Sequence, residues 1–348
     1  MTPALDEDKG TGREYPERIR WEGKGVSAEE ITAELDRLHR AAGGPGRVLA
    51  LARTLNLIVV PCSDRTATGV DRKLDELGSH TPSRTMVLRE HAKNGIDASV
   101  VMECETPAGA GLVGLCHDRV LLRMEAARLE HSASLLAPLL VSDLPTVLWL
   151  PDPRSEVPDP RLLERSQYLL VDSGSGGHDD LRRLASVAPG IRVHDLAWGR
   201  LEYWRAAVAA AFEPAERRGL LPQVTGLEMR YEERGLQAAL LLAGWIAARA
   251  GWRAADLERR NGTARAVATR EDGGDVDITF STAGCSSGCG GVDRVVFRAG
   301  SDEIAVERSG ATSSLRDLFA EALQPQPSFA RGYEPAVSAA AGMLDEAA

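Results

Sequence analysis

The sequence predicts an α/β fold: a mixed sheet covered by helices in the N-terminal part, with a smaller α+β C-terminal domain containing antiparallel strands. Between residues 25 and 215, strand-like apolar runs alternate with helix-like patterns, which is typical of a sheet covered by helices. Between residues 265 and 310, apolar and polar residues alternate in four runs, which favours antiparallel hairpins. The length of 348 residues fits two domains better than one.

The first predicted helix begins after Ser27. Ser27 and Glu30 have the spacing of a capping box, apolar residues follow at helical intervals, and the glycines at 43–46 end the helix. The next predicted elements are a strand at 53–61, a helix at 69–78, strands at 83–90, 97–106 and 111–124, a helix at about 127–141 and a strand at 145–150.

A proline-rich loop at 151–160 precedes a strand-turn-helix unit over residues 167–188. The C-terminal part is predicted to contain a strand at 223–233, a buried helix at 236–251, the four hairpin strands and a helix at 312–323. The predicted organisation is a flexible arm over residues 1–24, an α/β domain over 25–218, an α+β domain over 219–324 and a loose tail over 325–348.

Composition narrows the class of partner. A net charge of −10 argues against a nucleic-acid partner, because neutralising phosphates requires a surplus of Lys and Arg. No run approaches the roughly 20 apolar residues of a membrane span, and the first residues lack a secretory apolar region. Five scattered cysteines do not suggest a disulfide framework. We therefore expect a cytoplasmic protein without a membrane partner.

Residues 194–214 hold two tryptophans in a chain that is only 5% aromatic. With Asp195 as N-cap, one helix would place Trp198, Leu201 and Trp204 on a core-facing stripe. Its rim would carry Arg200, Tyr203 and Arg205, residue types that favour an interface over a catalytic pocket. The spacing also lets the Arg200 guanidinium lie over the Trp204 indole.

Three other segments have both a functional and a structural interpretation. The glycine-rich turn at 172–178 could cradle a phosphate, but Asp179 and Asp180 follow it and would repel an anion, so an ordinary strand-to-helix turn is favoured. His80, Ser83 and Arg84 could bind an acidic partner or simply begin a strand. Cys285 and Cys289 are too few for a zinc site but could pair under oxidation. No catalytic, cofactor or metal motif is complete.

Five strings occur in an order that resembles one protein family. They lie at residues 53–60, 79–84, 135–153, 168–173 and 194–214. Together they are similar to OpcA, the glucose-6-phosphate dehydrogenase assembly proteins. The most distinctive strings carry Asp143, Pro145 and Trp149 in one case, and Asp195, Trp198, Leu201 and Trp204 in the other.

The resemblance implies a non-catalytic protein, without a cofactor of its own, that binds glucose-6-phosphate dehydrogenase. It implies that the protein promotes the active oligomer of this enzyme and activates it allosterically in the oxidative pentose phosphate pathway. Cyanobacterial members of the family are associated with redox control through cysteines, but the glycine-rich loop with Cys285 and Cys289 departs from the pattern expected of the family. Two alternatives stay open: a sugar-phosphate-binding enzyme or sensor that uses the turn at 172–178, and an adaptor gated by Cys285 and Cys289.

Overall fold

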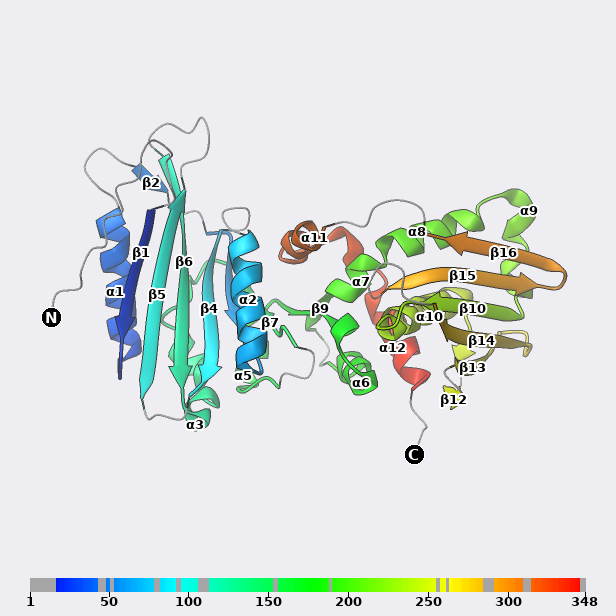
Figure 1. The fold of residues 1–348 in the computed structure, drawn as a ribbon, viewed down its shortest axis with the longest axis horizontal. Coiled ribbons are helices and arrows are strands. Elements are labelled where there is room, and N and C mark those ends of the chain that lie inside the picture. The colour runs from blue at the N-terminus through cyan, green and yellow to red at the C-terminus, as the bar shows by residue number, and fades with distance from the viewer. Residues whose placement is uncertain are drawn as a thin grey trace. The chain divides into compact units, whose positions relative to one another are not determined.

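The fold is seen in a computed structural model (Figure 1). It describes residues 17–42, 48–50, 53–77, 82–91, 95–105, 113–152, 156–187, 190–254, 257–260, 263–283, 291–308 and 314–344. The chain forms two compact units. The first contains residues 1–58 and 78–144, and the second contains residues 59–77 and 145–348.

The first unit is built on a mixed sheet. Its elements are β1 (Glu17–Gly23), α1 (Ala28–Ala42), β2 (Val48–Ala50), β3 (Leu55–Val59), β4 (Ser83–Glu90), β5 (Ile96–Glu105), β6 (Val113–Met124), α3 (Ala126–Leu129) and α4 (Ser132–Leu136). The strand order is β1-β5-β6-β4-β3, and β2 also pairs with β6. The pairs β1–β5 and β5–β6 are antiparallel, whereas β2 and β4 run parallel to β6. Helix α1 packs on β1 and β5.

The predicted capping box at the start of α1 is confirmed. The Ser27 amide donates to Glu30 Oε2 at 2.7 Å, and the Glu30 amide donates to Ser27 Oγ at 3.2 Å. Ile31, Leu35 and Leu38 are buried, as their helical spacing indicates. The capped helix therefore covers one side of the first sheet with an apolar stripe.

Two predictions about this unit are wrong. The arm expected over residues 1–24 contains β1, whose seven residues pair with β5 along its edge. The single helix expected at 127–141 is two short helices, because His131 adopts a non-helical backbone between them. The second helix ends at Leu136 with Ala137 as its C-cap, and Pro138, which follows, has no N–H with which to continue the helix.

The second unit begins with three parallel strands. Its elements up to residue 223 are α2 (Asp64–Leu77), β7 (Thr146–Trp149), α5 (Arg161–Glu164), β8 (Tyr168–Val171), η2 (Ser173–Ser175), α6 (His178–Ala185), β9 (Arg192–Asp195), α7 (Leu196–Arg200), α8 (Glu202–Ala211), α9 (Ala215–Arg218) and η3 (Leu221–Gln223). Strands β7, β8 and β9 follow one another in parallel, with β8 in the middle. Every residue of β7 and β8 is buried, which is typical of strands covered on both faces, whereas β9 begins with the exposed Arg192.

A mostly antiparallel sheet follows in the same unit. It is built from β10 (Gly226–Tyr231), α10 (Leu236–Ala250), β11 (Arg253–Ala254), β12 (Glu258–Arg260), β13 (Thr263–Thr269), β14 (Asp275–Thr282), β15 (Val292–Ala299), β16 (Asp302–Glu307), α11 (Leu315–Ala322), η4 (Ser328–Ala330) and α12 (Tyr333–Gly342). The order is β11-β13-β14-β10-β15-β16, and β12 also pairs with β13. Only the pair β10–β14 is parallel among the pairs described. Both parts of the predicted fold class are therefore confirmed.

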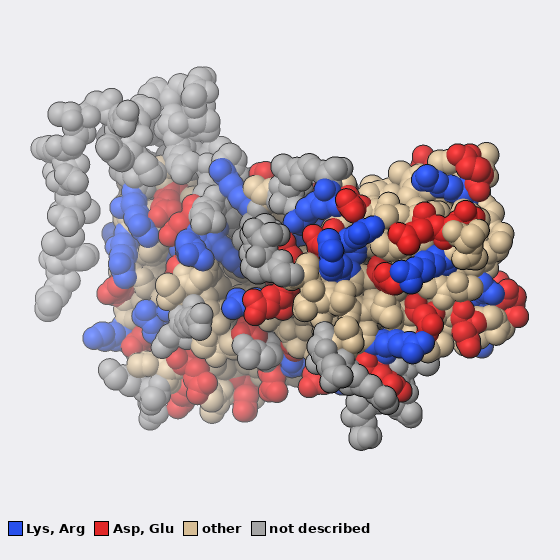
Figure 2. Space-filling model, turned by 45° about the vertical axis from the view of Figure 1, so that its right-hand side comes forward, with Lys and Arg blue, Asp and Glu red and all other residues tan. Residues whose placement is uncertain are grey.

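The outward side chains of this sheet form ion pairs. Arg265 pairs with Asp277 across β13 and β14, and Arg298 lies 2.7 Å from Glu228 across β15 and β10. On the face of the molecule in Figure 2, basic and acidic side chains are interspersed over the described residues. The described helices include none that is long and apolar enough to cross a membrane.

The tail expected to be loose after residue 324 is instead part of the core. Helix α12 packs against α10 and α6, and it buries Tyr333, Ala336 and Val337. The contact with α10 is so close that a Cβ atom on Gly244 would lie 2.3 Å from the Ala336 carbonyl oxygen. Residues 145–218 pack with these helices, so the units do not divide at the predicted boundary after residue 218.

Candidate functional site

Two carboxylates lie where parallel strands end. Asp172 follows β8 and Asp195 ends β9, so both lie at the carboxyl edge of this sheet, where α/β proteins commonly bind ligands. With Ser173, Arg200 and Tyr333 they form what we term the carboxyl-edge cluster. Its members come from β9, α7, α12 and the turn after β8.

Asp195 is the centre of this cluster and is almost completely buried. It caps α7 by accepting the Ala197 amide at 2.9 Å, and it accepts the Ser173 amide at 3.0 Å. The Ser173 hydroxyl and the Tyr333 hydroxyl donate to its other oxygen, the latter at 3.2 Å. The carboxylate thereby ties the turn after β8 to α7 and α12.

Arg200 neutralises the second carboxylate of the cluster. Its two terminal nitrogens donate to the two oxygens of Asp172 at 2.8 and 2.6 Å, which is the bidentate geometry of a strong ion pair. Burial alone would lower the pKa of Arg200, but the hydrogen bonds and charge of Asp172 raise it. Arg200 and Asp172 therefore neutralise each other's charge.

The glycine-rich turn at 172–178 is occupied by the protein's own carboxylates. The Ser173 amide donates to Asp195, and the Gly177 amide donates to Asp180 Oδ2 at 2.6 Å. Asp180 stands in the first turn of α6, where an anionic ligand would otherwise interact with the helix dipole. A phosphate at this turn would have to displace these carboxylates.

Burial gives Asp195 an unusual protonation equilibrium. Burial and the nearby charge of Asp172 outweigh the hydrogen bonds from Ser173 and Ala197, and raise the pKa of Asp195 from 3.8 to about 6. Between these values the folded chain holds a proton that the unfolded chain releases. The resulting contribution to stability is therefore fully present below pH 3.8 and is lost as the pH rises through about 6.

Asp195→Asn is expected to remove this pH dependence. From pH 4 to pH 6.5 the free energy of unfolding of the wild type should fall relative to that of the variant, by up to about 3 kcal/mol. Urea unfolding of both proteins across this range measures the difference. Parallel pH profiles would show that Asp195 does not titrate in this window.

The segment predicted to be one helix is two helices, α7 and α8, joined at Leu201. Its tryptophans and Leu201 are buried: Trp198 is 0%, Leu201 2% and Trp204 2% exposed. Arg200 does not stack on Trp204, because its guanidinium is turned towards Asp172. The core-facing stripe is thus present, although the chain bends in its middle.

Arg205, expected at the rim, makes its described contacts within the protein. Its guanidinium lies 3.8 Å from the centre of the Trp198 ring and donates to the Trp198 carbonyl at 2.6 Å and the Phe329 carbonyl at 3.3 Å. Burial lowers the pKa of Arg205 to about 10, so the side chain stays charged at neutral pH. The bend at Leu201 exposes the Trp198 carbonyl to this donor, which explains why Arg205 turns inward.

Tyr203 is the one large hydrophobic side chain that is exposed within the described part of the chain, at 37%. Its ring meets Trp204 edge-on, and its hydroxyl donates to the Glu307 carbonyl at 3.2 Å. Ala206 and Ala210 continue the exposed side of α8 at helical spacing. We call Tyr203, Ala206 and Ala210 the α8 face.

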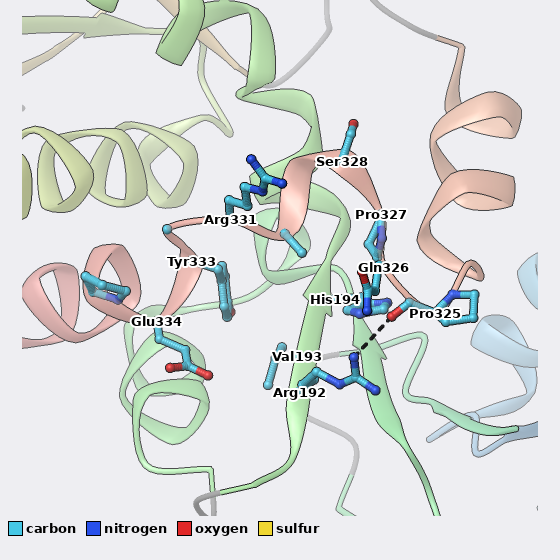
Figure 3. A pocket seen from close by; sticks show the side chains of 13 residues that line it. Arg192, Val193, His194, Pro325, Gln326, Pro327, Ser328, Arg331, Tyr333 and Glu334 are labelled. Carbon is cyan, nitrogen blue, oxygen red and sulfur yellow. Dashed lines mark hydrogen bonds between the residues drawn. The ribbon is translucent and has the colours of Figure 1, made fainter.

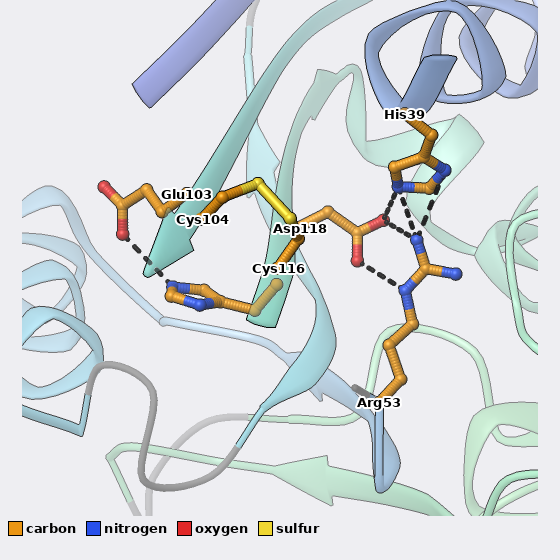
Figure 4. Close-up of a disulfide and its surroundings, with 7 residues drawn as sticks. His39, Arg53, Glu103, Cys104, Cys116 and Asp118 are labelled. Carbon is orange, nitrogen blue, oxygen red and sulfur yellow. Dashed lines mark hydrogen bonds and ion pairs between the residues drawn. A yellow bond between two sulfur atoms is a disulfide. The ribbon is translucent and has the colours of Figure 1, made fainter. Parts of the chain in front are cut away.

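Arg84 and Ser83, expected to meet a partner, are buried in the first unit. Arg84 donates to Asp118 Oδ2 and to the Leu139 carbonyl, both at 2.9 Å. Asp118 also accepts two hydrogen bonds from Arg53, each 3.0 Å long (Figure 4). The Ser83 hydroxyl is 2.9 Å from that of Thr85. Neither residue can therefore reach a partner without unfolding the strand, and His80 lies outside the described residues.

The segment 142–149 forms a turn and the buried strand β7, so its distinctive residues have structural roles. The Asn56 side chain donates to the carbonyls of Val141 and Leu144, at 3.0 and 3.3 Å, and so holds the turn beside Asp143, which is exposed. Pro145 leads into β7. The side chain of Trp149 is fully buried and meets Phe319 at a ring distance of 4.6 Å.

The cysteines behave differently from the expectation. Cys285 and Cys289 lie outside the described residues. Cys104 and Cys116, which gave no sign of pairing in the sequence, form a disulfide between β5 and β6 (Figure 4). The antiparallel register places them directly opposite each other, with Cα atoms 4.0 Å apart. Cys62 is an exposed free thiol.

Sequence reasoning considered Asp172 and Ser173 only as part of a possible phosphate-binding turn, and it missed Tyr333. An Asp and a Ser directly after the apolar strand "YLLV" were an available signal, because polar residues at this position lie at the carboxyl edge of the sheet. Tyr333 gave no such signal, since it lies in a segment read as a loose tail.

The chain matches two domain models of one family. One describes the glucose-6-phosphate dehydrogenase subunit N-terminal domain and matches residues 74–188; the other describes the C-terminal domain and matches residues 191–327. Two solved structures are also similar: KijD10, a 3-ketoreductase from Actinomadura kijaniata (12% identity, 84% of this chain and 96% of that chain, TM-score 0.44), and a myo-inositol dehydrogenase from Lactobacillus casei (10%, 82% and 93%, 0.41). Both TM-scores are too low to contribute to an assignment.

Curated relatives named OpcA, an OxPP cycle protein, come from cyanobacteria. The protein from Nostoc punctiforme is 29% identical over 203 residues, which are 56% of this chain and 43% of the relative. The protein from Synechocystis is 27% identical over 235 residues, which are 66% of this chain and 48% of the relative. Each match spans less than half of the relative. Because the two domain models together match more than half of the chain, it belongs to the OpcA family of glucose-6-phosphate dehydrogenase subunits.

Proposed function

We propose that the protein is a non-catalytic assembly factor and allosteric activator of glucose-6-phosphate dehydrogenase. The observation that carries this proposal is the match of two successive domains to a family described as subunits of that enzyme. The names of the cyanobacterial relatives associate the same family with the OxPP cycle. The protein would act by binding the active conformation or oligomer of the dehydrogenase more tightly than the inactive one.

The carboxyl-edge cluster supports a non-catalytic role. A general acid or base must reach a substrate proton. Here Arg200 holds Asp172, and four donors surround the buried Asp195. The alternative function, a sugar-phosphate enzyme or sensor using the turn at 172–178, would require the carboxylates of that turn to move away.

We place the dehydrogenase contact on the α8 face and the exposed part of Arg200 beside it. Tyrosine and arginine are enriched among the residues that dominate interface energetics. The small side chains of Ala206 and Ala210 let another surface approach the helix closely around the Tyr203 ring. Arg205, Ser83 and Arg84 are left out of this contact because they are less exposed than Arg200, whose side chain remains 38% exposed in its ion pair.

Tyr203→Ala is expected to weaken binding to the dehydrogenase by about 1–3 kcal/mol, or roughly tenfold to hundredfold in Kd. The purified chain should raise the activity of the dehydrogenase from the same organism and co-elute with it on size exclusion. Titration of that activation with wild type and variant gives the two affinities. Tyr203→Phe is the matched control: it keeps the exposed ring, removes the hydroxyl bond to Glu307, and should bind nearly as the wild type does.

Two results would contradict these proposals separately. If saturating wild-type protein neither binds nor activates the dehydrogenase, the proposed function is wrong. If activation occurs and Tyr203→Ala has wild-type affinity, the function stands and the contact lies on another surface.

A further inference from the structure

A cavity of about 590 Å³ lies in the second unit between β9 and the segment 325–335 (Figure 3). Cavities of this size are in the range that binds small molecules. Its polar lining includes Arg192 and His194 from β9, and Arg331, Tyr333 and Glu334 from the second segment. None of these side chains belongs to the α8 face.

Helix α12 begins at this cavity without a capping side chain. Its N-cap is Gly332, in the left-handed region at φ 79°, and no side chain accepts from its first amides. Among the residues described, no acceptor is found for the amides of Tyr333 and Glu334, and Pro335 has no N–H. In contrast, Ser314 caps α11. The uncapped start of a ten-residue helix favours an anion.

The charged side chains of the lining favour the same class of ligand. Arg192 and Arg331 contribute two positive charges and Glu334 one negative charge, which leaves a local surplus of one positive charge in a chain of net charge −10. Arg192 is fixed to the Pro325 carbonyl at 3.3 Å and keeps further N–H groups for a ligand. No hydrogen bond or ion pair of the Arg331 side chain is described.

A second, independent observation is the buried His194, which is 2% exposed. Its Nδ1 lies 2.8 Å from the Ala322 carbonyl, which can only accept, so Nδ1 carries the proton. Burial lowers the pKa of His194, so the ring is neutral at pH 7 and its Nε2 is a hydrogen-bond acceptor. No described residue donates to this nitrogen. A ligand hydroxyl would supply the missing donor.

From these features we propose that the cavity binds a phosphorylated sugar or a similar small hydroxylated phosphate ester. The phosphate lies at the start of α12 with Arg331 and Arg192, and a hydroxyl group donates to His194 Nε2. Glu334 accepts a second hydroxyl, which compensates for its repulsion of the phosphate. This site goes beyond the proposed binding of the dehydrogenase, and it is tested on the chain alone.

Isothermal titration calorimetry of the purified full chain, shown to be free of dehydrogenase activity, tests the proposal. The probes are glucose 6-phosphate, glucose and inorganic phosphate. We expect glucose 6-phosphate to bind at least tenfold more tightly than either fragment, since only the ester satisfies both the helix start and His194. Arg331→Gln should weaken that binding about tenfold, as expected for losing a charge-assisted hydrogen bond.

Arg217→Gln is the matched control, because Arg217 is exposed on α9 and does not line the cavity. Glu334→Gln should tighten the binding of inorganic phosphate by removing the repelling charge. The proposal is overturned if glucose 6-phosphate does not bind at millimolar concentration, if inorganic phosphate binds as tightly, or if Arg331→Gln and Arg217→Gln have the same affinity. None of these results depends on whether the chain activates a dehydrogenase.

Discussion

Trp198→Ala is expected to lower the free energy of unfolding by about 3–5 kcal/mol, a large part of the stability of an ordinary domain. The indole is fully buried, lies beneath the Arg205 guanidinium and meets the Tyr333 ring edge-on at 6.0 Å. Truncation would remove this apolar contact area, leave a cavity, and deprive the half-buried Arg205 of its aromatic partner. Urea unfolding followed by circular dichroism measures the loss.

The matched control is Tyr203→Ala, five residues along, where the ring is 37% exposed. The free energy of unfolding should fall clearly less in Tyr203→Ala, because the Tyr203 side chain buries less apolar area when the protein folds. Equal losses for the two variants would contradict the assignment of Trp198 to the core and Tyr203 to the surface. The pair also separates folding from binding, because Tyr203→Ala is the variant expected to lose affinity for the dehydrogenase.

Asp118→Asn is the other substitution with a large expected effect, a loss of about 3–5 kcal/mol. Burial alone would raise the pKa of Asp118, but neighbouring His39, Arg84 and Arg53 outweigh it and lower the pKa. Removing this negative charge would leave two buried guanidinium groups without the carboxylate that compensates them. Thermal and urea unfolding of the variant measure the cost.

Asp277→Asn is the control for this substitution. It removes the same charge from an ion pair with Arg265 that is exposed to water, and it should leave the free energy of unfolding nearly unchanged. If Asp118→Asn has the same free energy of unfolding as the wild type, the ion pairs of Asp118 with Arg53 and Arg84 do not stabilise the first unit. That result would then reopen a binding role for Arg84.

The sequence predicts well where local patterns decide the structure. The capping box at Ser27 and the burial of Trp198 and Trp204 follow from spacing alone. The arginines of the same segment could not be assigned in this way. Whether Arg200 and Arg205 face outward depends on Asp172 and Phe329, which lie 28 and 124 residues away in the sequence.

Nonlocal pairing also explains the other misplaced features. Strand β1 is polar enough to resemble a free arm, and it becomes ordered because β5 offers it a complete row of hydrogen-bonding groups. The disulfide depends on the register of β5 on β6, which brings two cysteines 12 residues apart face to face. The cavity beside β9 depends on the return of residues 325–335, for which the sequence gave no sign.

The close contact between Gly244 and Ala336 has a practical consequence for dissecting the protein. The match to the C-terminal domain model ends at residue 327, before α12 begins. A fragment cut at that limit would lack the helix that covers α10. The apolar side of α10 would then be exposed to solvent, and exposed apolar surfaces promote self-association. Fragments meant for pull-down or crystallisation should therefore run to at least residue 344, and affinity tags at this end should be spaced away from the last helix.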